Sequence, residues 1–263
     1  MLRLGPIGFL NTKPIIYGLE KNLIPNDFEL IYDVPSVCAD KLKNKSIDLA
    51  LIPSIEYARS GQYFIVPDIC ISSKGLVNSV LLYSKTEFSN IKTIALDTNS
   101  RTSATLIRIL MSNVFGIKPI YYQSSPNLQA MLENYDAGLI IGDKALYYQP
   151  ENLNILDLGE SWFRLTGLPF VYAFWAGWPG VIDRKGIKIL HQSLDLGLKN
   201  IRVIAEEFAL QGNGTPKINS DYLMTNIRFK LGPEELEGLK LFYKYAHEFG
   251  QIAILPEIKF YDA

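Results

Sequence analysis

The chain has 263 residues, with 26 Lys and Arg against 27 Asp and Glu, two His and two Cys. At about 150 residues per domain, this length predicts one or two domains whose core needs no disulfide or structural metal. The formal net charge of −1 argues against a dedicated nucleic-acid binder, which normally carries a basic excess. The few His and Cys residues, without a CxxC pair, argue against a metal site.

The apolar stretches predict neither export nor membrane insertion. The N-terminal stretch is interrupted by Arg3, Gly5 and Pro6, whereas a secretory signal needs about 7–15 uninterrupted apolar residues. No later stretch reaches the roughly 18 apolar residues of a membrane span. We therefore expect a cytoplasmic protein without a membrane partner, in which Cys38 and Cys70 are reduced and buried.

The first third of the chain alternates short strands with helices. Apolar runs predict three strands, over residues 2–9, 28–34 and 48–54. Amphipathic segments predict three helices, over residues 12–21, 37–44 and 55–59. Asn11, Ser36 and Ser54 stand where helix N-caps are expected, and Gly61 stands where the third helix ends. This alternation predicts a parallel sheet with helices on its faces.

The middle of the chain repeats the alternation, and the tail is mostly helical. Five further strands are predicted, over residues 77–84, 93–97, 119–123, 137–142 and 169–177. Two helices are predicted between them, over residues 101–115 and 127–135. After residue 177 we expect a long helix over 183–210, a turn over 212–217, and a helix that begins at Pro233. This tail is expected to pack against the first third.

The order of these elements predicts an α/β fold with two lobes and a central ligand cleft. The first lobe would contain residues 1–84 and 177–263, and the second would contain 85–176. The chain would cross between them near residues 84–92 and 176–179. Proteins of this class bind ligands outside the carboxyl ends of their strands.

Three strand-to-helix turns carry side chains suited to an anion. Their polar residues are Asn11, Thr12, Ser54, Ser100, Arg101, Thr102 and Ser103. The free N–H groups of a helix start attract carboxylate or phosphate, and an arginine can grip a carboxylate with two bonds. The same residue types also serve as ordinary N-caps, so both interpretations remain open.

Other motifs are missing or ambiguous. GxGxxG, GxxxxGK[ST] and GxSxG are all absent, which argues against nucleotide chemistry and against a hydrolase triad. His191 and His247 are expected to be packing or surface residues. Asp143 is either a site residue or an N-cap.

The strand over residues 169–177 is aromatic on one face. Alternation places Phe170, Tyr172 and Phe174 on the same side. Such a face belongs either to the core or to the lining of a pocket for an unsaturated ring.

Several motifs resemble the chorismate dehydratases of the futalosine menaquinone pathway. The similar segments lie in consistent order and are FLNTKP (9–14), DLALIPSIEYARS (48–60), ISSKGLVNSVLLYS (71–84), ALDTNSRTSATLIRILM (95–111), LIIGDKAL (139–146) and DLGESWFRLTGLPFVYAFWA (157–176). The resemblance implies a type II periplasmic-binding-protein fold and the dehydration of chorismate without metal or organic cofactor. The tail beyond about residue 180 carries little of this resemblance.

The resemblance also implies roles for individual residues. Asn11 and Ser79 match the residues proposed for catalysis. The segment Ser100 to Ser103 matches the one that holds a carboxylate in the family. With the polar turns described above, the substrate-binding residues that we expect are Thr12, Ser54, Ser100, Arg101, Thr102, Ser103, Gly142 and Asp143. Asn78 departs from the pattern, because relatives usually carry Gly at that position.

The chemistry of chorismate suits this set of residues. Chorismate is a dianion, and the ring hydrogen that must leave is vinylogously acidic. We expect the enolpyruvyl carboxylate of the substrate to take that proton, with Asn11 orienting it and Ser79 bonding the departing hydroxyl. A non-catalytic binding protein for a small carboxylate is the alternative, and a ligand-sensing regulatory domain is a third.

Overall fold

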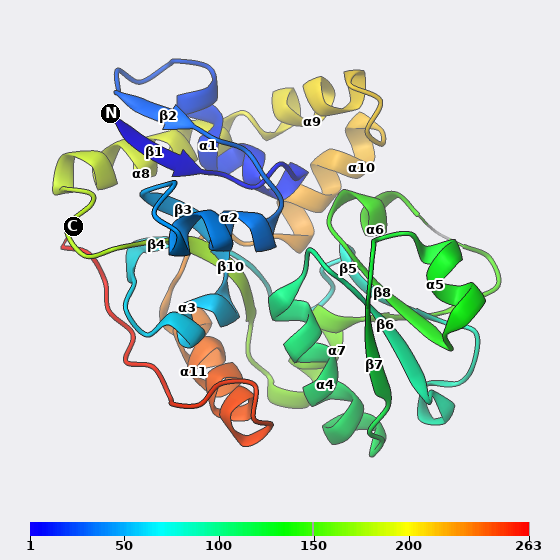
Figure 1. Ribbon diagram of the computed structural model, residues 1–263. Helices are drawn as coiled ribbons and strands as arrows, with labels where there is room; N and C mark the ends of the chain where they lie inside the picture. The colour runs from blue at the N-terminus through cyan, green and yellow to red at the C-terminus, as the bar shows by residue number, and fades with distance from the viewer. Residues whose placement is uncertain (149, 263) are drawn as a thin grey trace.

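Two five-stranded sheets form the centres of two lobes in this computed structural model, which describes residues 1–148 and 150–262 (Figure 1). The first sheet has the order β2 (Phe28–Leu30), β1 (Leu2–Gly5), β3 (Leu49–Pro53), β10 (Phe170–Gly177), β4 (Phe64–Ser73). The second sheet has the order β7 (Ile120–Ser124), β6 (Thr93–Asp97), β8 (Ala137–Ile141), β5 (Val80–Ser84), β9 (Asn154–Asp157). The predicted α/β fold with two lobes is confirmed.

Both sheets combine parallel and antiparallel pairs. β1 runs parallel to β2 and β3, and β6 runs parallel to β7 and β8, as the alternation predicts. β10 is antiparallel to β3 and β4, and β5 is antiparallel to β8 and β9. β5 is the first strand after the chain passes to the second lobe, and β10 is the first strand after it returns to the first lobe. Each runs antiparallel to its neighbours in the sheet that it joins.

The positions of these two strands correct the expected crossings. β5 belongs to the second sheet and β10 to the first, so the chain crosses at 74–79 and 167–169. Both strands are buried on nearly every residue. A strand with two apolar faces does not indicate from its own sequence which sheet it joins, because pairing depends on distant residues.

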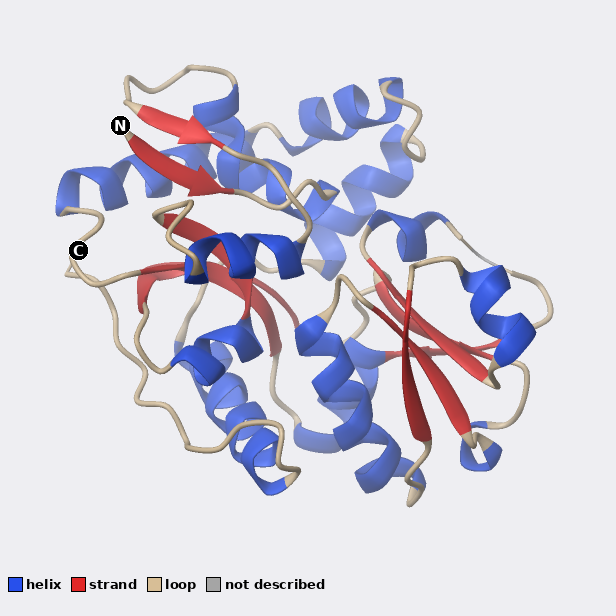
Figure 2. Ribbon diagram, viewed as in Figure 1, coloured by secondary structure: helices blue, strands red, loops and turns tan. Residues whose placement is uncertain are grey.

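Helices cover both sheets (Figure 2). Those before the second crossing are α1 (Lys13–Glu20), α2 (Pro35–Lys43), α3 (Ser54–Ser60), α4 (Arg101–Phe115), α5 (Leu128–Asn134), α6 (Asp143–Tyr147) and α7 (Leu158–Thr166). Those of the tail are α8 (Arg184–Lys199), α9 (Ile201–Leu210), α10 (Pro216–Asp221) and α11 (Pro233–Glu248). The predicted helix over residues 101–115 is confirmed. The single helix expected over 183–210 is wrong, because the backbone of Asn200 leaves the helical region and separates α8 from α9.

The tail packs on the first lobe, as predicted. α8 crosses α1 closely at Gly197, where a Cβ atom would lie 2.0 Å from the carbonyl oxygen of Pro14. Ser193 secures this crossing, because its hydroxyl donates to the carbonyl of Ile15 at 2.9 Å. Farther along, the backbone of Phe229 and Tyr261 bonds to β4, so the tail also covers the outer edge of the first sheet.

Residues that the sequence assigns to packing lie away from the cleft. Cys38 and Cys70 are fully buried, and burial raises the pKa of each thiol to about 12, so both stay protonated. His191 contacts the carbonyl oxygen of Pro67 at 3.0 Å, and His247 lies on the surface. Among the described residues, none of the helices has the length and apolar character needed to cross a bilayer.

Candidate functional site

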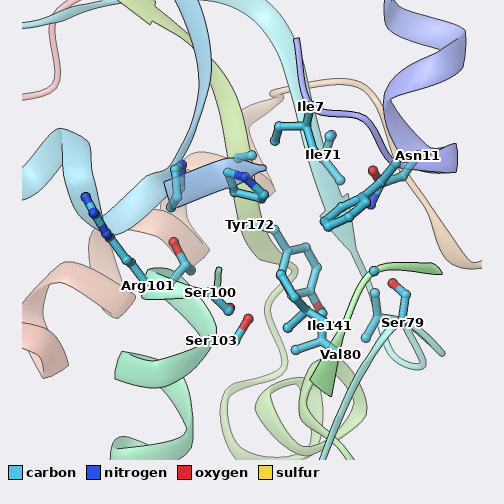
Figure 3. Close-up of a pocket in the computed structure, with 17 residues that line it drawn as sticks. Ile7, Asn11, Ile71, Ser79, Val80, Ser100, Arg101, Ser103, Ile141 and Tyr172 are labelled. Carbon is cyan, nitrogen blue, oxygen red and sulfur yellow. The ribbon is translucent and has the colours of Figure 1, made fainter. Parts of the chain in front are cut away.

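A cavity lies between the lobes, beyond the carboxyl ends of β1, β3, β6 and β8 (Figure 3). It encloses about 60 Å³, far less than the roughly 300–1,000 Å³ of ordinary ligand pockets. The lobes therefore approach each other closely here. Seven predicted site residues line it, and these are Asn11, Ser79, Ser100, Arg101, Thr102, Ser103 and Gly142.

Asn11 lies in the short turn Leu10–Thr12 that precedes α1. Its side chain does not cap α1, which excludes the ordinary explanation for an amide at this position. Nδ2 instead donates to the hydroxyl of Tyr222 at 3.2 Å. Oδ1 is buried and has no hydrogen-bond partner among the described residues. A buried acceptor without a partner is costly, so this oxygen is suited to a ligand.

Ser79 immediately precedes β5 and directly follows a strained residue. Asn78 has a φ of 58°, in the left-handed region that Gly and Asn tolerate best. This explains why Asn can replace the Gly expected here. The backbone N–H of Asn78 donates to Asp157 Oδ2 at 2.7 Å, so the turn is anchored before it reaches Ser79.

Tyr222, which sequence reasoning missed, joins these two side chains. Its hydroxyl lies 2.8 Å from Ser79 Oγ as well as 3.2 Å from Asn11 Nδ2. It comes from the π-helical turn Tyr222–Asn226 in the tail, where no motif marks it. Burial raises its pKa well above the ordinary value for tyrosine, so the phenol keeps its proton.

The opposite wall is the start of α4. Ser100 is the N-cap residue, but its side chain makes no capping hydrogen bond. Ser100 and Ser103 line the cavity, and the N–H groups of the first turn have no partner within the helix. In Figure 3 the ring of Tyr172 lies between this wall and the pair Asn11 and Ser79. Such a helix start is suited to a carboxylate.

Arg101 and Thr102 connect the lobes in addition to lining the cavity. The Arg101 guanidinium bonds Asp40 at 2.7 Å and Glu56 at 3.0 Å, and in Figure 3 it points away from Tyr172. Thr102 Oγ1 accepts from the backbone N–H of Ile55 at 3.2 Å. Arg101 therefore supports the α4 turn from behind, and its charge is already matched by two carboxylates.

Gly142 and Asp143 form the turn after β8. Gly142 has a φ of 67°, and a Cβ atom there would lie 2.8 Å from the Phe9 ring, so only Gly fits. Asp143 does not cap a helix, since Oδ1 accepts from the backbone N–H of Leu10 at 3.1 Å. Burial raises the pKa of Asp143 to about 6. Asp143 thus holds the Asn11 turn against the second lobe and does not line the cavity.

Thr12 and Ser54 are not brought to the cavity. Thr12 is fully buried beside it, and its hydroxyl has no partner among the described residues. Ser54 donates to the carbonyl of Val171 at 2.8 Å, which ties α3 to β10. The structure gives Ser54 a packing role.

The rest of the lining is mainly apolar and was not predicted from the sequence. It includes Phe9, Ile71, Val80 and Ile141, which come from both lobes. Tyr172 was placed either in the core or in a pocket, and the structure selects the pocket, with its hydroxyl 2.9 Å from Ser73 Oγ. The alternation of side chains along β10, which places Tyr172 on the aromatic face, was the one feature of the sequence that pointed to this position.

Comparison with known proteins now adds to this geometry. A protein family described as Menaquinone biosynthesis matches residues 2–248. The chain belongs to this family. A chorismate dehydratase of Thermus thermophilus is 28% identical over 258 residues, covering 88% of this chain and 94% of the relative. One from Campylobacter jejuni is 29% identical over 247 residues, covering 91% of this chain and 95% of the relative. These relatives are distant, so they support the family more firmly than the reaction.

Solved structures confirm the type II periplasmic-binding-protein fold for this member of the menaquinone biosynthesis family. Protein AF1704 of Archaeoglobus fulgidus has a TM-score of 0.81 at 17% identity, covering 95% of this chain and 98% of its own. The periplasmic aliphatic sulphonate binding protein SsuA of Escherichia coli has a TM-score of 0.67 at 15% identity, and the match covers 100% of this chain and 94% of that protein. At these identities the likeness concerns the fold alone.

Proposed function

We propose that this protein is a chorismate dehydratase, a lyase that removes water from chorismate to give 3-[(1-carboxyvinyl)oxy]benzoate. The observation that carries the proposal is the cavity itself, which has Asn11 and Ser79 on one wall and the open start of α4 on the other. The two relatives named chorismate dehydratase support the choice of substrate.

The start of α4 would bind the ring carboxylate. Removal of the ring hydrogen beside the ether sends electrons toward this carboxylate, so negative charge builds on it. The first-turn N–H groups and the hydroxyls of Ser100 and Ser103, which line the cavity, would supply the donors, and donors fixed in advance stabilise such charge best. Tyr172 and the apolar lining would pack against the ring.

The substrate would supply the base. Among the described residues that line the cavity, the titratable side chains are those of Arg101 and Tyr172. Arg101 is a permanent cation, and burial raises the pKa of Tyr172 well above its ordinary value. The enolpyruvyl carboxylate of chorismate would therefore take the proton.

Asn11 would act on the carboxyl group that takes the ring proton, and Ser79 would act on the departing hydroxyl. Asn11 Oδ1, which has no partner among the described residues, would accept a hydrogen bond from the carboxyl group once that group holds the proton. Ser79 would donate to the departing hydroxyl. The C–H and C–OH bonds break, the ring becomes aromatic, and the carboxyl group passes its proton to the departing hydroxide, which leaves as water. No oxidation state of the protein changes.

Binding of a substrate this large would require the lobes to separate first. The enclosed space of about 60 Å³ holds only a few water-sized volumes. The ties at Arg101 and Asp143 would then open and re-form around the ligand, in the hinge motion that two-domain binding folds use.

Incubation of the purified protein with chorismate tests the proposal. Ultraviolet absorbance should show loss of chorismate and growth of an aromatic product, and Ser79→Ala should slow turnover at least about 100-fold. Ser84→Ala is the matched control, because it removes a buried hydroxyl from the far end of β5, the strand that Ser79 precedes, where Oγ donates to the carbonyl of Thr86 at 2.8 Å. Calorimetric binding of chorismate without turnover would contradict the proposal and indicate a non-catalytic carboxylate-binding protein.

A further inference from the structure

A phenol from the tail contacts both side chains to which we assign the chemistry. The Tyr222 hydroxyl is 2.8 Å from Ser79 Oγ and 3.2 Å from Asn11 Nδ2, and it lies behind them rather than among the described lining residues. We infer that Tyr222 is a positioning residue that holds Asn11 and Ser79 in their reactive orientations. This inference rests on the proposed function.

The tail is built to hold Tyr222 in place. The residue follows α10 and starts a π-helical turn, a local irregularity often found at functional sites. One turn earlier, Asn219 is fully buried and bonds the carbonyls of Ala205 and Asn213. Asn219 Oδ1 also accepts from the hydroxyl of Tyr147 on α6 at 2.7 Å. Figure 1 shows α10 beside α6, where the tail reaches the junction of the lobes.

The hydrogen bonds through Tyr222 have a preferred direction. An amide nitrogen only donates, so Asn11 Nδ2 gives its hydrogen to the phenol oxygen. Either hydroxyl could donate across the 2.8 Å contact between Tyr222 and Ser79 Oγ, and we assign the phenol as the donor because its hydrogen has no other acceptor among the described residues. Ser79 therefore keeps its own hydrogen for the departing hydroxyl of the substrate. Asn11 keeps its carbonyl oxygen free for the carboxyl group that receives the proton.

A purely structural tyrosine in this tail makes a different kind of contact. Tyr261 is also buried, and its hydroxyl donates to a backbone carbonyl, that of Trp178, at 2.6 Å. The Tyr222 hydroxyl instead contacts two site side chains, Asn11 of the first lobe and Ser79 at the entry to the second. A role confined to packing would not explain that choice of partners.

The test compares Tyr222→Phe with the matched control Tyr261→Phe. Tyr222→Phe should lower kcat about 10- to 100-fold while KM changes less than about threefold, because misplacement of reacting groups mainly affects the chemical step. Tyr261→Phe should leave both constants unchanged. A kcat for Tyr222→Phe within twofold of the wild type, or the same loss in both variants, would overturn the inference.

Two further readouts separate positioning from a general loss of order. In a double-mutant cycle, Tyr222→Phe should lower kcat less in the Ser79→Ala background than in the wild type, because part of its effect acts through Ser79, whereas full additivity would contradict this. Crystal structures should show Asn11 or Ser79 in altered rotamers in Tyr222→Phe. Unchanged rotamers would overturn the inference even if the wild type failed to turn over chorismate. That failure, by contrast, would refute only the proposed function.

Discussion

Asp143 gives a stability prediction whose sign follows from the structure. Its folded pKa is about 6, against an ordinary value of 3.8, and burial is the main cause. Below about pH 4 the carboxyl is protonated in both states, and its contribution to stability is complete. As the pH rises to 6, ionisation in the unfolded chain draws the equilibrium toward unfolding, and that contribution is lost. A pKa that is about two units higher in the folded state changes the free energy of unfolding by at most about 3 kcal/mol.

Asp143→Asn should remove the cost of burying an ionised carboxylate, because an amide carries no charge at any pH. Its side-chain oxygen can still accept the Leu10 N–H bond, which Asp143 accepts at 3.1 Å. The variant should therefore be up to about 3 kcal/mol more stable than the wild type at pH 8 and equal to it near pH 4, as measured by urea unfolding. Asp136 is the contrasting control. Bonds from the backbone of Lys92 and Thr93 lower its pKa, so Asp136→Asn should lose stability at pH 8.

The Asp143 reasoning would be refuted by an Asp143→Asn variant whose stability gain is the same at both pH values, or by a loss at pH 8. The same variant also bears on the reaction. Because Asp143 does not line the cavity, kcat should stay within about tenfold of the wild type. A much larger loss would instead identify Asp143 as a protein base.

Substitutions at three other residues test separate parts of the account. Asn11→Ala should lower kcat at least about 100-fold with an unchanged circular dichroism spectrum, and near-normal turnover would remove Asn11 from the mechanism. Asn78→Ala should cost about 1–2 kcal/mol in urea unfolding, whereas Asn78→Gly should be nearly neutral, because the cost comes from the left-handed backbone. Equal losses in these two variants would refute that explanation. Arg101→Gln should raise KM less than about tenfold, because the guanidinium is paired with Asp40 and Glu56. A rise of several orders of magnitude would place it on the substrate.

Local patterns predicted the elements that carry most of the site. The helix over residues 101–115 begins and ends where its amphipathic spacing predicts, and Gly116 closes it with a φ of 69°. The strand-to-helix turns at Asn11 and at Ser100 both reach the cavity. Such features depend on residues close together in the chain, and propensity and capping rules describe them well.

Features that depend on distant residues were not predictable. Tyr222 reaches Asn11 and Ser79 only after the tail has wrapped around the first lobe. The direction of Arg101 is decided by Asp40 and Glu56, which lie on helices of the other lobe. β4 was missed because Pro67 and Asp68 interrupt its apolar pattern. In each case the information lies in tertiary contacts that no local window contains.

The scarcity of titratable groups in the cavity bears directly on the proposed chemistry. A fold used for binding in its structural relatives would here perform an elimination with amides, hydroxyls and a helix start. Fixed donors of this kind stabilise developing charge without changing protonation state. The acid–base step is then left to the substrate, and the formal net charge of −1 means that attraction of a dianion must be local.

The dependence of kcat on pH, measured with chorismate, tests the central claim most directly. We predict turnover whose kcat is flat between about pH 6.5 and 9, because the carboxylate base belongs to the substrate and is fully ionised in that range. A limb with an apparent pKa between about 5 and 8 would reveal a protein base and contradict the substrate-assisted mechanism. Absence of turnover at every pH would contradict the proposed function itself.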